Sequence, residues 1–122
     1  MKATELQIGD WVFTQSGAEK VVEIREDVVH TDEWAYNYDA IKPIPLTPEV
    51  LEKNGFIKEK NDNNMYRWNW SITSDCVSYD KGTGIVRIFH VLGGLAFVEP
   101  LEYVHELQHA LRLCRIEKEV EL

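Results

Sequence analysis

Alternating apolar and polar positions dominate the first 46 residues of the chain. The expected strands are residues 6–13, 21–25, 28–31 and 40–44. Turn-forming pairs, Ser16-Gly17 and Glu26-Asp27, separate the first three of these segments. Short strands joined by tight turns pair as an antiparallel meander. Residues 1–46 therefore predict a strand meander, and barrel-like closure of this half is the alternative to an open sheet.

A short helix is expected over residues 47–56. Thr47 can cap the first free amides, Pro48 suits the first helical position, and Glu49 complements the positive end of the helix dipole. Gly55 fits the left-handed residue that closes a helix, and Phe56 can then fold back onto the last turn.

Residues 65–99 return to strand patterning. Tyr66, Trp68 and Trp70 alternate with polar residues, which predicts a half-buried strand with the aromatic row on its core face. An aromatic platform for a sugar or a base is the alternative interpretation of this row. Hairpin strands are expected at 76–79, 85–91 and 95–98.

The last element is predicted to be a helix over residues 101–116. Val104, Leu107, Leu111 and Cys114 recur at helical spacing and define one apolar face. The sequence thus predicts a single α+β domain over residues 1–122, in which this helix packs on the sheet and strands outnumber helices.

Composition and charge narrow the function classes. Hydrophobic residues make up 44% of the 122 residues, which is typical of a globular chain. The formal net charge is −8, so direct binding to nucleic acid is disfavoured, because a phosphate-binding surface would oppose the net field. The same charge leaves open a DNA-mimic inhibitor, in which carboxylates imitate phosphates.

The sequence shows neither a signal peptide nor an apolar run long enough to span a membrane. Cys76 and Cys114 lie far apart without a CxxC pair, so we expect free buried thiols in a reducing compartment. A cytoplasmic location without membrane association follows as an expectation.

One short motif suggests chemistry. His105, Glu106 and His109 fit H-E-x-x-H, in which two imidazoles one helical turn apart bind zinc and the glutamate polarises the bound water. A zinc metallopeptidase with Glu106 as general base and His105 and His109 as ligands is therefore one hypothesis for this chain.

Two observations count against that hypothesis. A catalytic zinc needs a third protein ligand, and the residues after His109 contain neither His nor Asp. Helical geometry also places His105 and His109 nearly opposite the apolar face. That placement permits a site facing a cleft, but it equally describes the exposed polar surface that we favour, which could bind zinc or nickel adventitiously. The favoured interpretation assigns no catalytic residue, no metal ligand and no cofactor.

A second aromatic row, Trp34, Tyr36 and Tyr38, lies in a loop-like stretch. Acidic residues flank it, which favours exposure and makes these three residues the candidate binding site.

Three segments carry a resemblance to known sequences. They are residues 6–10 (LQIGD), 41–56 with IKPIPLT and NGF at its two ends, and 100–108 (PLEYVHELQ). In that order they resemble a group of small uncharacterised proteins of gut anaerobic bacteria and their phages and mobile elements. The resemblance implies no known activity. In that group the position of Glu106 is commonly Gln and that of His109 is often Asn, which argues that the zinc motif is a local coincidence.

The sequence therefore favours a small acidic cytoplasmic accessory of phage or mobile-element origin that is not an enzyme. It is expected to act by binding another protein, with self-association as a further expectation. The zinc metallopeptidase and the DNA mimic are the two alternatives.

Overall fold

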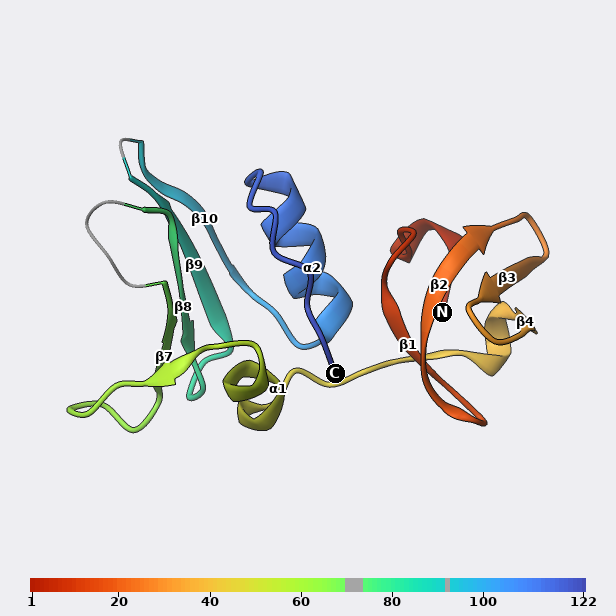
Figure 1. Cartoon of the computed structure of the whole chain (residues 1–122), viewed down its shortest axis with the longest axis horizontal. Helices are drawn as coiled ribbons and strands as arrows, with labels where there is room; N and C mark the ends of the chain where they lie inside the picture. The colour runs from red at the N-terminus through yellow and green to blue at the C-terminus, as the bar shows by residue number, and fades with distance from the viewer. Residues whose placement is uncertain (70–73, 92) are drawn as a thin grey trace. The chain divides into compact units, whose positions relative to one another are not determined.

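The computed structural model of the chain describes residues 1–69, 74–91 and 93–122. Two compact units are present. The first comprises Met1–Pro45 and Tyr103–His109, and the second comprises Leu46–Glu102 and Ala110–Leu122. Each unit contains a five-stranded antiparallel sheet, and all strands except β5 and β6 are labelled in Figure 1. With two α-helices, the chain is a strand-rich α+β protein, as the sequence predicts.

The sheet of the first unit has the order β4-β3-β2-β1-β5. Its strands are β1 (Trp11–Thr14), β2 (Gly17–Ile24), β3 (Val28–Thr31), β4 (Ala35–Asn37) and β5 (Lys42–Pro43). Every neighbouring pair is antiparallel, which confirms the meander. In the described part of the chain β4 and β5 are two separate edges, so the sheet is not closed into a barrel.

The ends of this sheet differ from the predicted strands. Ala3–Glu5 forms a 3-10 turn, and the first strand begins at Trp11 instead of Leu6. The reason is a tight turn before the strand, in which the Asp10 carboxylate accepts the backbone N–H of Gln7 at 2.7 Å. Strand β4 was not predicted, because the alternating aromatics around it are flanked by acidic residues and were assigned to a loop.

A small apolar core lies beneath the first sheet. Its buried side chains are Leu6, Val12, Val21, Val29, Tyr36 and Ile41. The strands β1, β2, β3 and β4 supply four of these six, one from each strand, as expected for a sheet with one buried face.

The second unit contains a short helix and the other sheet, ordered β10-β9-β8-β7-β6. Its elements are α1 (Pro48–Lys53), β6 (Ile57–Lys58), β7 (Met65–Trp68), β8 (Cys76–Asp80), β9 (Ile85–His90) and β10 (Gly94–Pro100). The predicted helix ends are confirmed. Thr47 Oγ1 accepts the Val50 N–H, and Gly55 has φ +86° while Phe56 bonds back to the Leu51 carbonyl.

The centre of the second sheet is apolar. Val77, Val86 and Ile88 are fully buried on one face of β8 and β9, and Tyr66 of β7 is buried on the same side. This confirms the core position of Tyr66. Trp68 is half-buried, and Trp70 lies outside the described residues.

Helix α2 (Val104–Leu113) is shorter than the predicted span of 101–116. At its start, Leu101 still belongs to the sheet region, because its N–H donates to the Gly84 carbonyl at 2.9 Å. At its end, Arg115 adopts φ +60° and the Ile116 N–H bonds back to the Leu111 carbonyl, which closes the helix. In the described part of the chain no helix is long and apolar enough to cross a membrane.

Candidate functional site

The first turn of α2 positions Glu106. The Tyr103 N–H donates to Glu106 Oε1 at 2.9 Å, while the Glu106 N–H bonds to the Tyr103 carbonyl at 3.2 Å. A glutamate that reaches back to the N-cap amide is the side-chain half of a capping box. The carboxylate proposed as general base is thus occupied in closing the start of its own helix.

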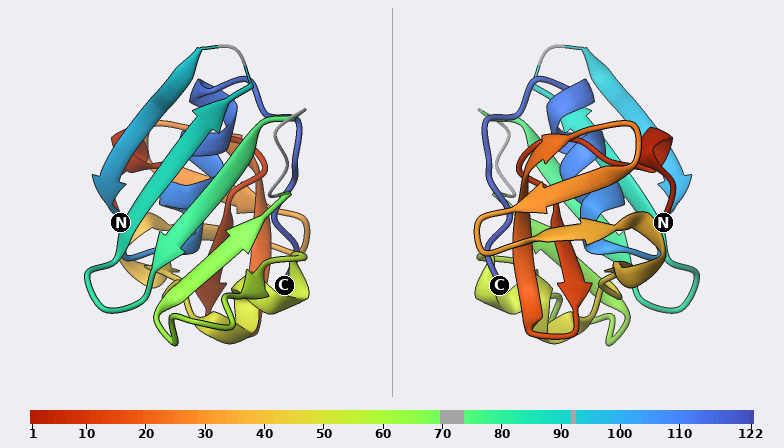
Figure 2. Two further views of the ribbon diagram at one scale, coloured as in Figure 1. Left: turned by 90° about the vertical axis from the view of Figure 1, so that its left-hand side faces the viewer. Right: turned by 90° about the vertical axis from the view of Figure 1, so that its right-hand side faces the viewer.

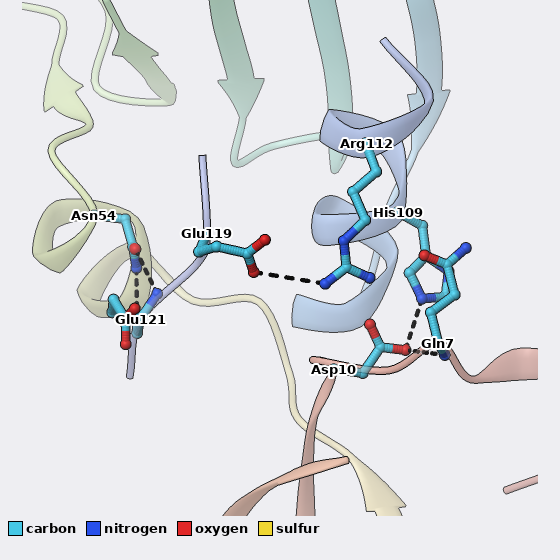
Figure 3. Close-up of polar contacts among 7 residues, drawn as sticks. All are labelled: Gln7, Asp10, Asn54, His109, Arg112, Glu119 and Glu121. Carbon is cyan, nitrogen blue, oxygen red and sulfur yellow. Dashed lines mark hydrogen bonds and ion pairs between the residues drawn. The ribbon is translucent and has the colours of Figure 1, made fainter. Parts of the chain in front are cut away.

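His109 pairs with a carboxylate from the other end of the sequence. Its Nε2 lies 2.7 Å from Asp10 Oδ2, the same oxygen that accepts the Gln7 N–H (Figure 3). Asp10 is fully buried and sits at the end of the turn before β1, where Gly9 takes φ +92°. The pair joins the N-terminal loop to α2 inside the first unit.

His105 is buried, with 5% of its surface exposed, which corrects the expectation of an exposed polar face. Its ring stacks on Tyr103 at 5.9 Å between centroids and meets His109 edge-on at 5.4 Å. The predicted exposure was wrong because the N-terminal segment with Asp10 approaches the helix face opposite Leu107, so both faces are covered.

Burial also sets the protonation of His105. Desolvation lowers the pKa of His105 below its ordinary value, and the nearby Asp10 carboxylate opposes that shift only in part. Nδ1 of the neutral ring has no hydrogen-bond partner within the described residues. His105 therefore acts mainly as an apolar packing residue, although its buried Nδ1 lacks a hydrogen-bond partner among the described residues.

The arrangement does not fit a zinc centre. Nε2 of His109 faces Asp10, and the Glu106 carboxylate caps the helix. Across residues 1–69, 74–91 and 93–122, no three His, Cys, Asp or Glu side chains are grouped to hold a metal ion. In this part of the chain no third ligand lies beside His105 and His109.

The second candidate site, Trp34, Tyr36 and Tyr38, is divided by the structure. Trp34 is 67% exposed, in agreement with the prediction. Tyr36 is buried, so its expected exposure was wrong, and Tyr38 is half-buried against the first core with its hydroxyl on the Arg25 carbonyl. Strand alternation explains the difference, because Tyr36 is the one inward-facing residue of β4.

Sequence reasoning missed a buried carboxylate in β2. Glu19 is 3% exposed and accepts hydrogen bonds from the hydroxyls of Thr14 (2.5 Å), Thr31 (2.6 Å) and Tyr36 (3.0 Å). Burial alone would raise the pKa of Glu19, but the three hydroxyl donors outweigh it and hold the pKa below its ordinary value. The only sequence signal was the period-two spacing of Glu19 and Val21, which puts both on the inner face.

The Glu19 network fixes the turn that presents Trp34. Thr31, which donates to Glu19, also bonds to Trp34 through its backbone: the Thr31 N–H donates to the Trp34 carbonyl at 2.8 Å. The Trp34 N–H donates in turn to Thr31 Oγ1 at 3.1 Å. Asp32 and Glu33, the two residues inside this turn, are exposed. A rigid turn thus carries an exposed indole beside two carboxylates.

No protein-family model, curated protein or solved structure matches the chain.

The two cysteines are free and buried, as expected, and burial raises the pKa of both thiols.

Proposed function

We propose that the chain is a non-enzymatic protein-binding accessory that engages its partner through Trp34. The observation that carries the proposal is the 67% exposure of this indole. It lies on a turn in which both the backbone C=O and the backbone N–H of Trp34 are hydrogen-bonded to Thr31. Tryptophan is enriched among the residues that dominate binding energy in protein interfaces. Because hydrogen bonds to Thr31 already hold the backbone of Trp34, less backbone conformational entropy is lost on binding.

The charge around Trp34 defines the chemistry of the partner. Asp32 and Glu33 flank the indole in the sequence and are exposed, and the whole chain carries a net charge of −8. The matching surface is an apolar pocket that accepts one indole and has lysine or arginine side chains at its rim. Opposite charges at an interface rim mainly accelerate association and make it sensitive to salt.

Glu19 supports this site from below. Its carboxylate receives hydroxyls from β1, β3 and β4, so it ties together the strands that flank the turn. In this proposal Glu19 and Thr31 are positioning residues, and Trp34 is the residue that contacts the partner. The roles of Tyr36 and Tyr38 are restricted to packing by their buried or half-buried positions.

The cellular setting is also a proposal. The resemblance of residues 6–10, 41–56 and 100–108 to small phage and mobile-element proteins supports such an origin. The free thiols of Cys76 and Cys114 are compatible with a cytoplasmic location.

The test is photo-crosslinking with a benzophenone amino acid placed at position 34 in cells of a candidate host. The matched control carries the same group at Ile57, which is 74% exposed in the second unit. We expect a discrete adduct from position 34 only. The protein identified in the adduct is then purified, and Trp34→Ala should weaken its binding by about tenfold or more, as for an interface hot spot.

Two outcomes would overturn the proposal. One is equal adducts from positions 34 and 57, and the other is unchanged affinity of the Trp34→Ala variant for the purified partner. The DNA-mimic alternative makes a different prediction, because double-stranded DNA should then compete with the chain for its partner.

A further inference from the structure

The outer face of the second sheet carries a row of polar side chains across three strands. Arg67 of β7 pairs with Ser78 of β8, and Ser78 pairs with Arg87 of β9. Residues that pair directly across antiparallel strands project from the same face of a sheet. Val77 and Ile88 alternate with them and are fully buried on the opposite face. In the left view of Figure 2 no helix is drawn in front of β8 and β9. Two guanidinium groups thus flank one hydroxyl on the outer face, and these three residues are called the arginine row.

Two members of the arginine row lack a partner within the described residues. Ser78 is 5% exposed, and its hydroxyl makes no hydrogen bond to another described residue. Arg87 is half-buried, and no hydrogen bond or ion pair joins its guanidinium to residues 1–69, 74–91 or 93–122. Buried hydroxyl and guanidinium groups normally have partners. The chain has 21 acidic residues against 13 basic ones, so a shortage of carboxylates does not explain the missing partner. These donors are therefore available to an acceptor from outside the chain.

The charge of the row favours a monoanion. Arg67 Nη1 lies 3.1 Å from Glu59 Oε2, so the charges of this pair offset each other. Asp80, on the same face of β8, accepts the Gly82 N–H in its own turn at 2.8 Å. Arg87 supplies the one positive charge of the row that no described carboxylate contacts. A carboxylate carries one negative charge and matches it, whereas a phosphate monoester carries about −1.5 to −2 near pH 7.

Apolar side chains stand at both ends of the arginine row. Ile57 of β6 pairs with Arg67, and Val98 of β10 pairs with Arg87. Ile57 is 74% exposed and Val98 is 47% exposed. Neighbouring strands are about 4.8 Å apart, so each apolar side chain begins one strand away from a guanidinium group. A ligand that covers both kinds of surface carries an apolar group beside its negative charge.

We propose that the arginine row binds a carboxylate carried by an apolar group. The planar guanidinium of Arg87 donates to both carboxylate oxygens, and the Ser78 hydroxyl adds a further donor. Arg67 attracts the ligand while it keeps its bond to Glu59. The apolar part of the ligand lies on Val98. A free apolar acid and the acidic side chain of an apolar peptide share this chemistry.

The first experiment titrates the full chain with sodium hexanoate at constant ionic strength and follows the backbone amide resonances by NMR. We expect saturable shifts at Ser78 and Arg87. Acetate should bind about tenfold more weakly, because each buried methylene tightens binding about fourfold and hexanoate has more of them. Hexanol, which has the same apolar chain without the charge, should not saturate the site. Absence of saturable shifts, or equal binding of hexanol, would overturn the proposal.

A second ligand distinguishes the two sources of the carboxylate. It is a capped tripeptide with one glutamate between two leucines. Tighter binding of the peptide than of hexanoate would identify an acidic segment of another protein as the natural ligand, and the reverse order would identify a free acid. Failure of both ligands to shift Ser78 and Arg87 would exclude the site.

The next experiment repeats the hexanoate titration on variants. Arg87→Met keeps an apolar stem of similar length and should raise the dissociation constant about fivefold or more, since a charged hydrogen-bond donor is lost. Ser78→Ala should raise it about threefold. Arg25→Met is the matched control, because Arg25 is 63% exposed in the first unit and pairs with Glu23. The control should bind as wild type does. Equal affinity of Arg87→Met and Arg25→Met would overturn the proposal, provided that the dispersed spectra show both to be folded.

Glu59→Gln tests the charge argument. The substitution removes the carboxylate that offsets Arg67, so a second positive charge then faces the ligand. Inorganic phosphate should bind wild type more weakly than hexanoate does, and it should gain more affinity than hexanoate from Glu59→Gln. Tighter binding of phosphate than of hexanoate to wild type would contradict the assignment of a monoanion.

This inference is independent of the Trp34 proposal. Arg87→Met should leave the photo-crosslink from position 34 unchanged, and Trp34→Ala should leave the affinity for hexanoate unchanged. Loss of hexanoate shifts alone would refute the arginine row, and loss of the specific crosslink alone would refute the Trp34 site.

Discussion

The two sheets contain the same number of strands in the same antiparallel arrangement, yet their centres have different chemistry. Under the first sheet a carboxylate, Glu19, receives three hydroxyl groups from neighbouring strands. In the second sheet Val77, Val86 and Ile88 fill the corresponding centre, and among the described residues no buried carboxylate accompanies them. An apolar centre stabilises a sheet through buried area, whereas a hydrogen-bonded carboxylate requires each partner in its place.

The difference shows how one chain can combine two kinds of stability. The polar network makes the first sheet dependent on pH and specifies which strands meet at Glu19. The apolar centre of the second sheet holds no buried carboxylate among the described residues, and the outer strand β10 has seven residues. The substitutions below test this contrast.

The largest expected effect comes from the apolar centre. Ile88→Ala removes a fully buried side chain of β9 and should lower the free energy of unfolding by about 2–5 kcal/mol through lost burial and a residual cavity. Urea denaturation followed by circular dichroism measures the change. Val22→Ala, at a 47% exposed position, is the control and should cost about 0.5 kcal/mol or less. Equal losses from both variants would contradict the assigned core.

Glu19→Gln should cost about 1–3 kcal/mol at pH 7, because an amide replaces one acceptor oxygen with a donor that faces hydroxyl groups. The pKa of Glu19 lies below its ordinary value of 4.5 in the folded chain. Its stabilising contribution is therefore complete above pH 4.5 and is lost as the pH falls through the lower folded value.

Urea titrations from pH 7 down to pH 3 measure this dependence. The acid loss of stability should be smaller in Glu19→Gln than in wild type, and Glu33→Gln, at an exposed position, should resemble wild type. Parallel pH curves for all three proteins would show that the pKa of Glu19 does not change on folding, contrary to the expectation.

A polar contact in the second unit should have a smaller effect. The Asn54 amide donates to the Glu121 carbonyl and accepts the Glu121 N–H, both at 2.7 Å, which fastens the C-terminal segment to the end of α1 (Figure 3). Asn54→Ala should cost about 1–2 kcal/mol, since two backbone groups lose their partner. Faster hydrogen exchange at Glu121, and not in β8, is the measurement. Asn61→Ala, at an exposed position, is the control.

The smallest expected effect concerns His105. Its pKa is lowered by burial, so the unfolded chain binds the proton more readily and stability should fall as the pH drops below about 6.5, the ordinary value for histidine. Unfolding in urea at pH 7.5 and 5.5 measures the difference. His105→Phe should remove this component and keep the packing on Tyr103. An unchanged difference in this variant would assign the effect to another group.

Elements built from neighbouring residues were predictable. Thr47, Gly55 and Phe56 determine both ends of α1 through contacts within one turn, and those ends are observed as expected. The strands around the Ser16-Gly17 turn were also predicted, because tight turns act locally. The short edge strands β4 and β6 were missed, since they have only three and two residues and pairing to a neighbouring strand creates them.

The candidate site shows the same limit more clearly. Helical spacing predicted that His105 and His109 lie one turn apart, but not that a carboxylate nearly one hundred residues earlier would meet His109. It predicted exposure for His105, which is buried because a distant segment covers that face. Trp34 was predicted to be exposed, and it is. Tyr36 was predicted to be exposed as well, but it is buried and its hydroxyl donates to Glu19.

The sequence by itself determined what depends on neighbours: the α+β class, the start and end of α1, the positions of the main hairpins and the net charge. Only the tertiary structure decided which polar residues are buried, what each of them bonds to, and which edge stays open. Those outcomes depend on contacts between segments far apart in the chain, whose burial and hydrogen bonds are set by folding and leave no periodic trace in the sequence.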